Sequence, residues 1–173
     1  MPRFDATDAK CSVLTFKDGV LSAVAHDLRL SVERFTIEID EDTEAVAARF
    51  DTTSLRVDCA MKNGRPDPGT LSARNKREIE NNINTKVLHT RRYPEVVFRS
   101  STVSGEGDER RVEGTLEMHG VQRPLTAWAR RKDGRWSVDL QLHQPDFGVV
   151  PFTAMLGTLK VRAGLRVQVS VPG

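Results

Sequence analysis

The stretch RRVEGTLEMHGVQRPLTAWARR, at residues 110–131, carries the clearest structural signal in this sequence. Apolar and polar residues alternate along 112–118 and again along 121–129. Alternation with a period of two is typical of a β-strand that is buried on one face and exposed to solvent on the other. His119 and Gly120 lie between the two segments, and glycine readily supplies the positive φ of a tight turn. The stretch therefore predicts an antiparallel hairpin with one apolar face.

The same alternation recurs in most of the chain, in segments joined by short connections. Asp18-Gly19 and Asp133-Gly134 have the composition of two-residue hairpin turns. A change of apolar phase near His26-Asp27 indicates a bulge or sharp bend, which lets a sheet curl. Successive hairpins with one apolar face favour a closed antiparallel barrel of about eight strands, because closure removes exposed edges. A two-sheet sandwich is the alternative. Besides the central hairpin, the expected strands are 11–17, 20–33, 35–40, 46–50, 55–59, 96–104, 136–142 and 165–171.

One segment has the pattern of an α-helix. It follows the turn-forming sequence KNGRPDPG at 62–69, and Thr70 is placed to cap its first turn. Ile79, Ile83 and Val87 recur at intervals of four residues. This narrow apolar stripe on an otherwise polar segment predicts a helix over 70–88 that lies across the mouth or flank of the barrel.

Length and charge place the chain among ordinary globular proteins. Its 173 residues are expected to form one domain, 1–173, with a real hydrophobic core. Lys and Arg number 26 against 24 Asp and Glu, so the net charge of +2 gives no basic surface for nucleic acid. No apolar run reaches the roughly 18 residues that a membrane-spanning helix needs. The first residues lack a signal-peptide pattern, so we expect a cytoplasmic protein, or a periplasmic one if a leader has been removed.

Cysteines and histidines are the main candidates for chemistry. Cys11 and Cys59 are expected to be small buried thiols, with a disulfide between neighbouring strands as the alternative. The histidines have no HxxxH or HExxH spacing, so no metal site is expected. His26, followed by Asp27 at the predicted bend, is the candidate for a polar contact with a ligand and the best candidate for a general base. No nucleophile elbow, GxGxxG or phosphate-binding loop is present, so neither an enzyme nor a cofactor is expected.

Two surface features leave alternatives open. The basic pairs at 91–92, 110–111 and 130–131 are expected to be solvated strand ends, with the alternative that one pair receives a phosphate or carboxylate head group. Trp128 falls on the polar side of its strand, where it is covered by the helix, lies in a subunit interface or is exposed. Whether the chain forms a homodimer is also open.

Four stretches of the sequence resemble the YceI family of lipocalin-like, polyisoprenoid-binding domains. Residues 87–101 resemble the end of the family's helix, its Tyr-Pro step and the next strand, and 114–124 is similar to the family's G-x-L-x-x-x-G-V-x-x-P hairpin. Residues 146–171 resemble its closing segment, and 19–40 resembles its early strands more weakly. The resemblance implies an eight-stranded lipocalin-like antiparallel barrel with one flanking α-helix. It also implies an elongated apolar cavity for an isoprenoid or similar amphiphilic chain, and no shared catalytic residues.

The apolar interior and the resemblance together predict non-catalytic binding or carriage of a long-chain isoprenoid or fatty-acyl-type lipid. One alternative is a small hydrolase or isomerase that uses the same cavity with His26 as base. The other is a protein-interaction module whose barrel is filled and whose surface, around Trp128, makes the contacts. The inward-facing residues are candidates for the cavity wall, with plain core packing as the alternative for each; they are Ile37, Phe98, Leu116, Met118, Leu125, Ala127, Val138, Leu140, Val167 and Val169.

Overall fold

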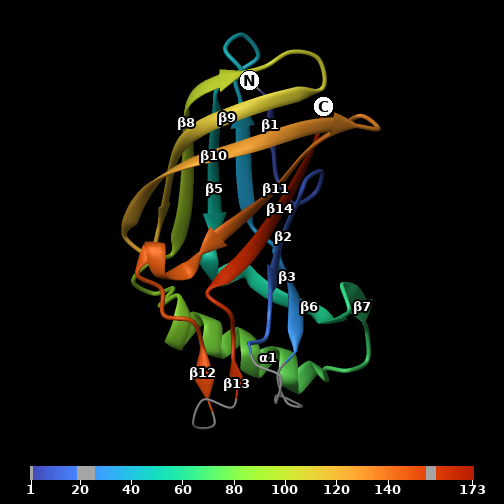
Figure 1. Ribbon diagram of the computed structural model, residues 1–173, viewed down its shortest axis with the longest axis vertical. Coiled ribbons are helices and arrows are strands. Elements are labelled where there is room, and N and C mark those ends of the chain that lie inside the picture. Colours follow the sequence, from blue (N-terminus) through green and yellow to red (C-terminus); the bar gives the residue numbers. More distant parts are fainter. Residues whose placement is uncertain (1, 19–25, 155–158) are drawn as a thin grey trace.

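In the computed structural model, which describes residues 2–18, 26–154 and 159–173, a single 12-stranded antiparallel sheet forms most of the molecule (Figure 1). The order across this sheet is β1-β4-β5-β8-β9-β10-β11-β14-β2-β3-β6-β7, and β12 and β13 form a separate pair. The strands are β1 (Arg3–Phe4), β2 (Lys10–Thr15), β3 (Asp27–Val32), β4 (Phe35–Ile39), β5 (Val46–Asp51), β6 (Leu55–Lys62), β7 (Arg65–Asp67), β8 (Glu95–Ser104), β9 (Glu109–Met118), β10 (Val121–Lys132), β11 (Arg135–His143), β12 (Thr153–Ala154), β13 (Leu159–Lys160) and β14 (Gly164–Pro172).

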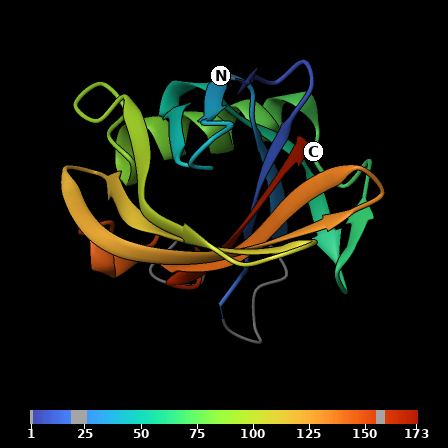
Figure 2. The same ribbon diagram turned by 90° about the horizontal axis from the view of Figure 1, so that it is seen from above.

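The sheet curls into a half-barrel, which Figure 2 shows from above as a curved wall around a central space. Its curvature brings strands that are far apart in this order close together. β3 leads into β4 with only Glu33 and Arg34 between them, although β4 lies near one end of the order and β3 near the other. In the same way, β5 leads into β6 through the 3-10 turn η1 (Thr52–Ser54). The lipocalin-like barrel class predicted from the sequence is therefore confirmed, and the two-sheet sandwich is wrong. The predicted closure is also wrong, because the sheet is a half-barrel whose strand order ends at β1 and β7.

The predicted number of eight strands is wrong, because the main sheet has 12. The segments expected from the sequence correspond to ten of these strands, and they include the divisions at Glu33-Arg34 and at η1, where the alternation changes phase. The short strands β1 and β7, at the two ends of the sheet order, were not expected, because two or three residues are too few to show an alternating pattern.

The central hairpin forms as predicted. Met118 pairs with Val121, and the turn residues His119 and Gly120 have φ values of 55° and 75°. Farther along, Ala127 pairs with Val112, and both are buried. The predicted turn at Asp133-Gly134 also forms, with φ values of 52° and 74°.

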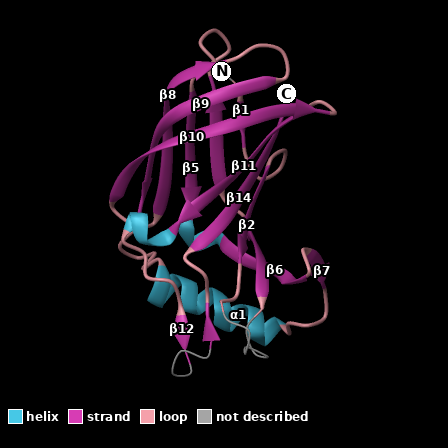
Figure 3. Ribbon diagram, in the orientation of Figure 1, coloured by secondary structure: helices cyan, strands magenta, loops and turns pink. Residues whose placement is uncertain are grey.

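The helical segments gather at one end of the half-barrel, opposite the two chain termini (Figure 3). The α-helix α1 (Ala73–Asn82) crosses this end, and none of its residues is buried, in agreement with the narrow apolar stripe. Its N-cap is Ser72, which exchanges hydrogen bonds with Asn75 in a capping box. The predicted cap, Thr70, is wrong: its hydroxyl donates to Asp67 Oδ2 instead, at 2.8 Å.

Two further helical turns lie at this end of the half-barrel. The helix continues into a π-helical turn, η2 (Ile83–Val87), and the 3-10 turn η3 (Gln144–Phe147) follows β11. In the described residues, no helix is long and apolar enough to span a bilayer.

Three further local predictions have different outcomes in the structure. The predicted turn at Asp18-Gly19 and the strand beginning at Val20 fall on 19–25, outside the described residues. The irregularity expected near His26-Asp27 lies a little later, as a register shift between Arg29 and Leu30 where β3 pairs with β6. Cys11 and Cys59 are buried free thiols, so the disulfide alternative is wrong.

Trp128 is the largest apolar side chain on the outer surface of β10. Its exposed fraction is 63%, so the helix does not cover it, and its place in a subunit interface stays a prediction. The guanidinium of Arg111 lies 5.6 Å from its ring centroid. This stacking covers one face of the indole with a neighbouring strand rather than with the helix.

Candidate functional site

The half-barrel encloses a cavity of about 530 Å³. Its wall is built from the inward-facing residues of β2, β4, β5, β8, β9, β10, β11 and β14, which is why aliphatic side chains dominate it. On β11, for example, Trp136, Val138, Leu140 and Leu142 face the cavity and alternate with exposed residues. The cavity is thus a direct product of the period-two pattern.

All ten residues predicted from the sequence to form the wall line this cavity, although their contact with a ligand stays a prediction. Ile37, Phe98, Leu116 and Ala127 are also buried in the hydrophobic core. The other six are Met118, Leu125, Val138, Leu140, Val167 and Val169, which are partly exposed to the cavity space. The wall is therefore partly ordinary core and partly free surface.

Other wall residues were not predicted. Trp136 and Leu142 belong to the same alternating segment as Val138 and Leu140, so the period was a sufficient signal for them. Cys11 and Val13 on β2 follow the same rule. Burial raises the pKa of the Cys11 thiol to about 12, so this side chain is neutral and unreactive at physiological pH.

Charged and aromatic side chains form one end of the cavity, which we call the mouth: Glu44, Arg110, Arg131 and Trp136. Arg110 Nε lies 2.6 Å from Glu44 Oε2, and a second guanidinium nitrogen lies 3.4 Å from Glu44 Oε1. The guanidinium groups of Arg110 and Arg131 each lie 5.2 Å from the Trp136 ring centroid. Arg131 is in turn paired with Asp108 at 2.8 Å.

The opposite end of the cavity, near η1 and η3, is lined by polar residues that form hydrogen bonds with the backbone. Thr52 is buried and its hydroxyl donates to the Tyr93 carbonyl oxygen at 2.8 Å. Gln144 is also buried, and its Nε2 donates to the Arg162 carbonyl oxygen at 3.0 Å. Both side chains line the cavity, and their hydrogen bonds hold this end of the wall in place.

His26 is half-buried and is not among the described residues that line the cavity. Its neighbour Asp27 has a structural role, because Asp27 Oδ1 accepts a hydrogen bond of 2.8 Å from the Lys17 backbone N–H. The structure therefore does not bring His26 together with the predicted wall, and a polar contact with a ligand stays a prediction. Within the described residues, no three His, Cys, Asp or Glu side chains are grouped as metal ligands.

Comparison with known proteins gives a consistent result. The YceI-like domain matches residues 6–172. Among solved structures, BcnA from Burkholderia cenocepacia is similar with a TM-score of 0.65 and 15% sequence identity, covering 95% of this chain and 96% of BcnA. The YceI protein of Campylobacter jejuni is similar with a TM-score of 0.60 and 15% identity, covering 91% of each chain. At these identities the structural likeness concerns the fold alone. No curated protein matches the sequence.

Proposed function

Because the chain belongs to the YceI-like domain family, we propose that it binds an amphiphilic molecule whose apolar chain lies in the barrel cavity, without changing it chemically. The observation that carries this proposal is the cavity of about 530 Å³ with its largely aliphatic wall. Ligand pockets in proteins typically measure about 300–1,000 Å³ and combine an apolar wall with a few polar groups. The mouth supplies such polar groups at one end, and Thr52 and Gln144 add neutral ones at the other.

The dimensions of the wall favour one extended chain. The inward-facing residues of β11 run from Trp136 to Leu142 along the cavity, and at about 3.4 Å per residue they span about 20 Å. Half of a bilayer core, the depth that one acyl chain occupies, is about 15 Å. An isoprenoid or fatty-acyl chain of that length therefore fits along the wall. Each methylene that leaves water contributes about 0.8 kcal/mol, so even a partly inserted chain is held strongly.

Binding without catalysis agrees with the chemistry of the wall. The Cys11 thiol is neutral because burial raises its pKa to about 12, so it lacks the thiolate that a nucleophile needs. Each charged side chain of the mouth is held in an ion pair: Arg110 pairs with Glu44, and Arg131 pairs with Asp108 outside the mouth. A base at His26 would have to act on a molecule outside the described wall. A filled interaction module is disfavoured because the barrel contains a cavity.

Native mass spectrometry of the purified protein, followed by organic extraction, tests the proposal. We expect a mass increase that corresponds to one long-chain molecule for each protein, and its loss after extraction. The extracted protein should then show a higher melting temperature when an isoprenoid or fatty-acyl compound is added. An apo mass together with an unchanged melting temperature for both classes of compound would contradict the proposal.

Two adjacent alanines of β5 provide a matched pair of variants. Ala48 is 5% exposed and lines the cavity, whereas Ala47 is exposed on the outer face. A leucine at position 48 displaces roughly two methylenes of the ligand, which at about 0.8 kcal/mol each corresponds to roughly tenfold weaker binding. Ala47→Leu adds the same side chain outside and should bind as the wild type does. Equal affinities for the two variants would place the ligand elsewhere.

A further inference from the structure

Arg110 holds a carboxylate at the mouth of the cavity. This residue lies near the start of β9, and its side chain is 20% exposed. It contacts both carboxylate oxygens of Glu44, at 2.6 and 3.4 Å. Its remaining terminal nitrogen donates to the Gly107 and Glu109 carbonyl oxygens, at 2.9 and 2.8 Å. These backbone contacts hold the guanidinium in place, and its other two nitrogens are directed to the Glu44 carboxylate.

The carboxylate comes from a loop residue with an unfavourable backbone conformation. Glu44 has a φ of 61°, in the left-handed region that non-glycine residues rarely adopt and that costs free energy. The preceding residues of the β4–β5 loop have hydrogen bonds of their own, since Asp40 Oδ1 accepts from the Asp42 and Thr43 backbone N–H groups. The Glu44 side chain is 46% exposed, so its carboxylate reaches water with little rearrangement.

Trp136 and Arg131 complete the surroundings of the pair. Arg110 and Arg131 both stack over the Trp136 ring at 5.2 Å, and all three line the cavity. Arg131 is engaged with Asp108 and is 43% exposed, so it is the more solvated of the two arginines. Arg110 is therefore the better-ordered cation at the point where an apolar chain in the cavity would end.

We propose that Arg110 binds the carboxylate of an amphiphilic ligand, and that Glu44 competes with that carboxylate for the same guanidinium. The proposal rests on the proposed function, since it concerns the head group of a molecule held in the cavity. Exchanging one carboxylate for another keeps the charge next to Arg110 constant, and Glu44 can be released by side-chain rotation alone, because its backbone N–H stays bound to the Asp40 carbonyl oxygen at 2.9 Å. The ligand class is thereby narrowed to long-chain carboxylates.

Isothermal titration calorimetry with dodecanoate and with dodecanol separates the head group from the chain. Glu44→Gln removes the competing charge while keeping the size of the side chain. We expect it to bind dodecanoate at least about fivefold more tightly than the wild type, because the binding-competent fraction rises, and to bind dodecanol unchanged. Arg110→Gln should bind dodecanoate more weakly than the wild type does and dodecanol with unchanged affinity. The melting curve of this variant shows whether it is folded.

Two matched variants serve as controls. Asp139 pairs with Arg166 on the outer face, next to the inward-facing Val138, so Asp139→Asn removes a carboxylate from an arginine far from the mouth. It should leave both affinities unchanged. Asp108→Asn removes the carboxylate that pairs with Arg131. If this variant binds dodecanoate more tightly than the wild type does, and Glu44→Gln does not, the assignment of the head-group site to Arg110 is overturned.

The remaining outcomes also separate the two proposals. If the wild type binds dodecanol while Glu44→Gln binds dodecanoate no more tightly than the wild type does, the head-group site is wrong and the chain site stands. If neither compound binds to the wild type or to Glu44→Gln, the cavity holds no such chain, and the proposed function fails together with the head-group site.

Discussion

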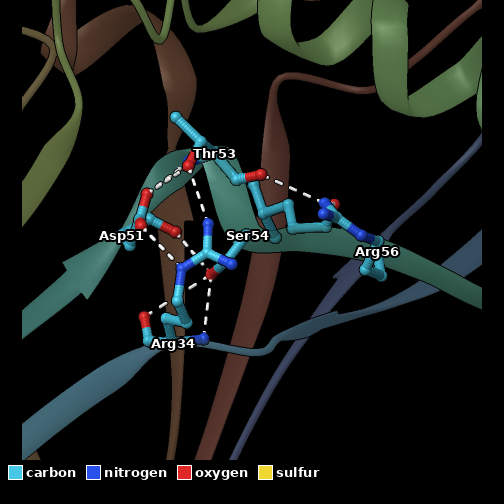
Figure 4. A network of polar contacts seen from close by, with 6 residues as sticks. Arg34, Asp51, Thr53, Ser54 and Arg56 are labelled. Atoms are coloured by element: carbon cyan, nitrogen blue, oxygen red, sulfur yellow. Dashed lines mark hydrogen bonds and ion pairs between the residues drawn. The ribbon is translucent and has the colours of Figure 1, made fainter.

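The backbone N–H of Arg34 donates a hydrogen bond of 3.0 Å to Oγ of Ser54, and this contact joins the two bends on which the curvature of the sheet depends (Figure 4). Arg34 lies between β3 and β4, and Ser54 ends the turn between β5 and β6. Ser54 is fully buried, and its hydroxyl donates to the Asp51 carbonyl oxygen at 2.7 Å. The Arg34 guanidinium spans the same junction, with Nε 3.0 Å from Asp51 Oδ2.

Replacing Ser54 by alanine should destabilise the protein. The change leaves the Arg34 N–H without its acceptor in a partly buried place and removes the buried Ser54 hydroxyl, which together lower the free energy of unfolding by about 1–3 kcal/mol. Urea denaturation followed by circular dichroism measures this loss. Ser101 is the control, because its exposed hydroxyl donates to the Glu113 carbonyl oxygen, and Ser101→Ala should change the free energy by less than about 0.5 kcal/mol. Equal losses in the two variants would show that the junction is unimportant.

Gly114 is required by the close approach of β8 to β9. A Cβ at this position would overlap the Arg99 carbonyl oxygen and would lie 2.7 Å from Phe98 Cζ and 2.8 Å from Ser100 Cα. Gly114→Ala therefore has to displace backbone, and we expect it to lower the free energy of unfolding by about 1–3 kcal/mol or more. Gly164→Ala is the control, since nothing lies within 4 Å of its Cβ position. Thermal unfolding of the two variants provides the comparison, and equal melting temperatures would contradict the expectation.

The inner face of the barrel could be predicted from the sequence because it follows from neighbours along the chain. Val138 and Leu140 face the cavity for the same reason that Ser137 and Asp139 face water: successive residues of a strand point to opposite sides. The turn at His119-Gly120 is equally local. These features need no knowledge of which strands pair.

The basic pairs 110–111 and 130–131 were candidates for a head-group site, but the arrangement of the mouth could not be predicted, because it depends on contacts between distant segments. Glu44 and Arg110 are 66 residues apart, and their pairing requires the β4–β5 and β8–β9 loops to meet at the same end of the barrel. A charged loop such as 41–44 carries no periodic signal for that meeting. The same holds for the junction of Arg34 with Ser54, whose two segments lie about 20 residues apart in the sequence.

Cys11 should resist thiol reagents as long as the protein is folded. Burial raises its pKa to about 12, so at pH 8 only about one molecule in 10,000 carries the reactive thiolate. In Cys59→Ala, where Cys11 is the remaining thiol, we expect labelling by a disulfide reagent to be at least about a hundredfold slower in buffer than in guanidinium chloride. Labelling at the rate of the unfolded chain would show that the cavity wall opens to solvent.

His119 is expected to make the stability of the fold depend on pH. Its pKa lies below the ordinary value of 6.5, chiefly because burial disfavours the charged ring; a hydrogen bond with the Phe147 backbone opposes this, and the charges of His89 and Arg92 add to it. Among the described residues, its buried Nε2 has no hydrogen-bond partner. The neutral ring is therefore the form that the folded protein prefers.

The sign of the effect follows from that preference, and His119→Asn tests it. Above pH 6.5 the ring is neutral in both the folded and the unfolded chain, so its contribution is fully present; as the pH falls below 6.5, the unfolded chain binds the proton first and the free energy of unfolding decreases. Asparagine tolerates the φ of 55° at this position and creates the Asn-Gly pair that hairpin turns favour. We expect His119→Asn to be at least as stable as the wild type at pH 7.5 and to lose less stability between pH 7 and pH 5, as measured by urea denaturation at each pH. A pH dependence as steep as that of the wild type would assign the titration to another group.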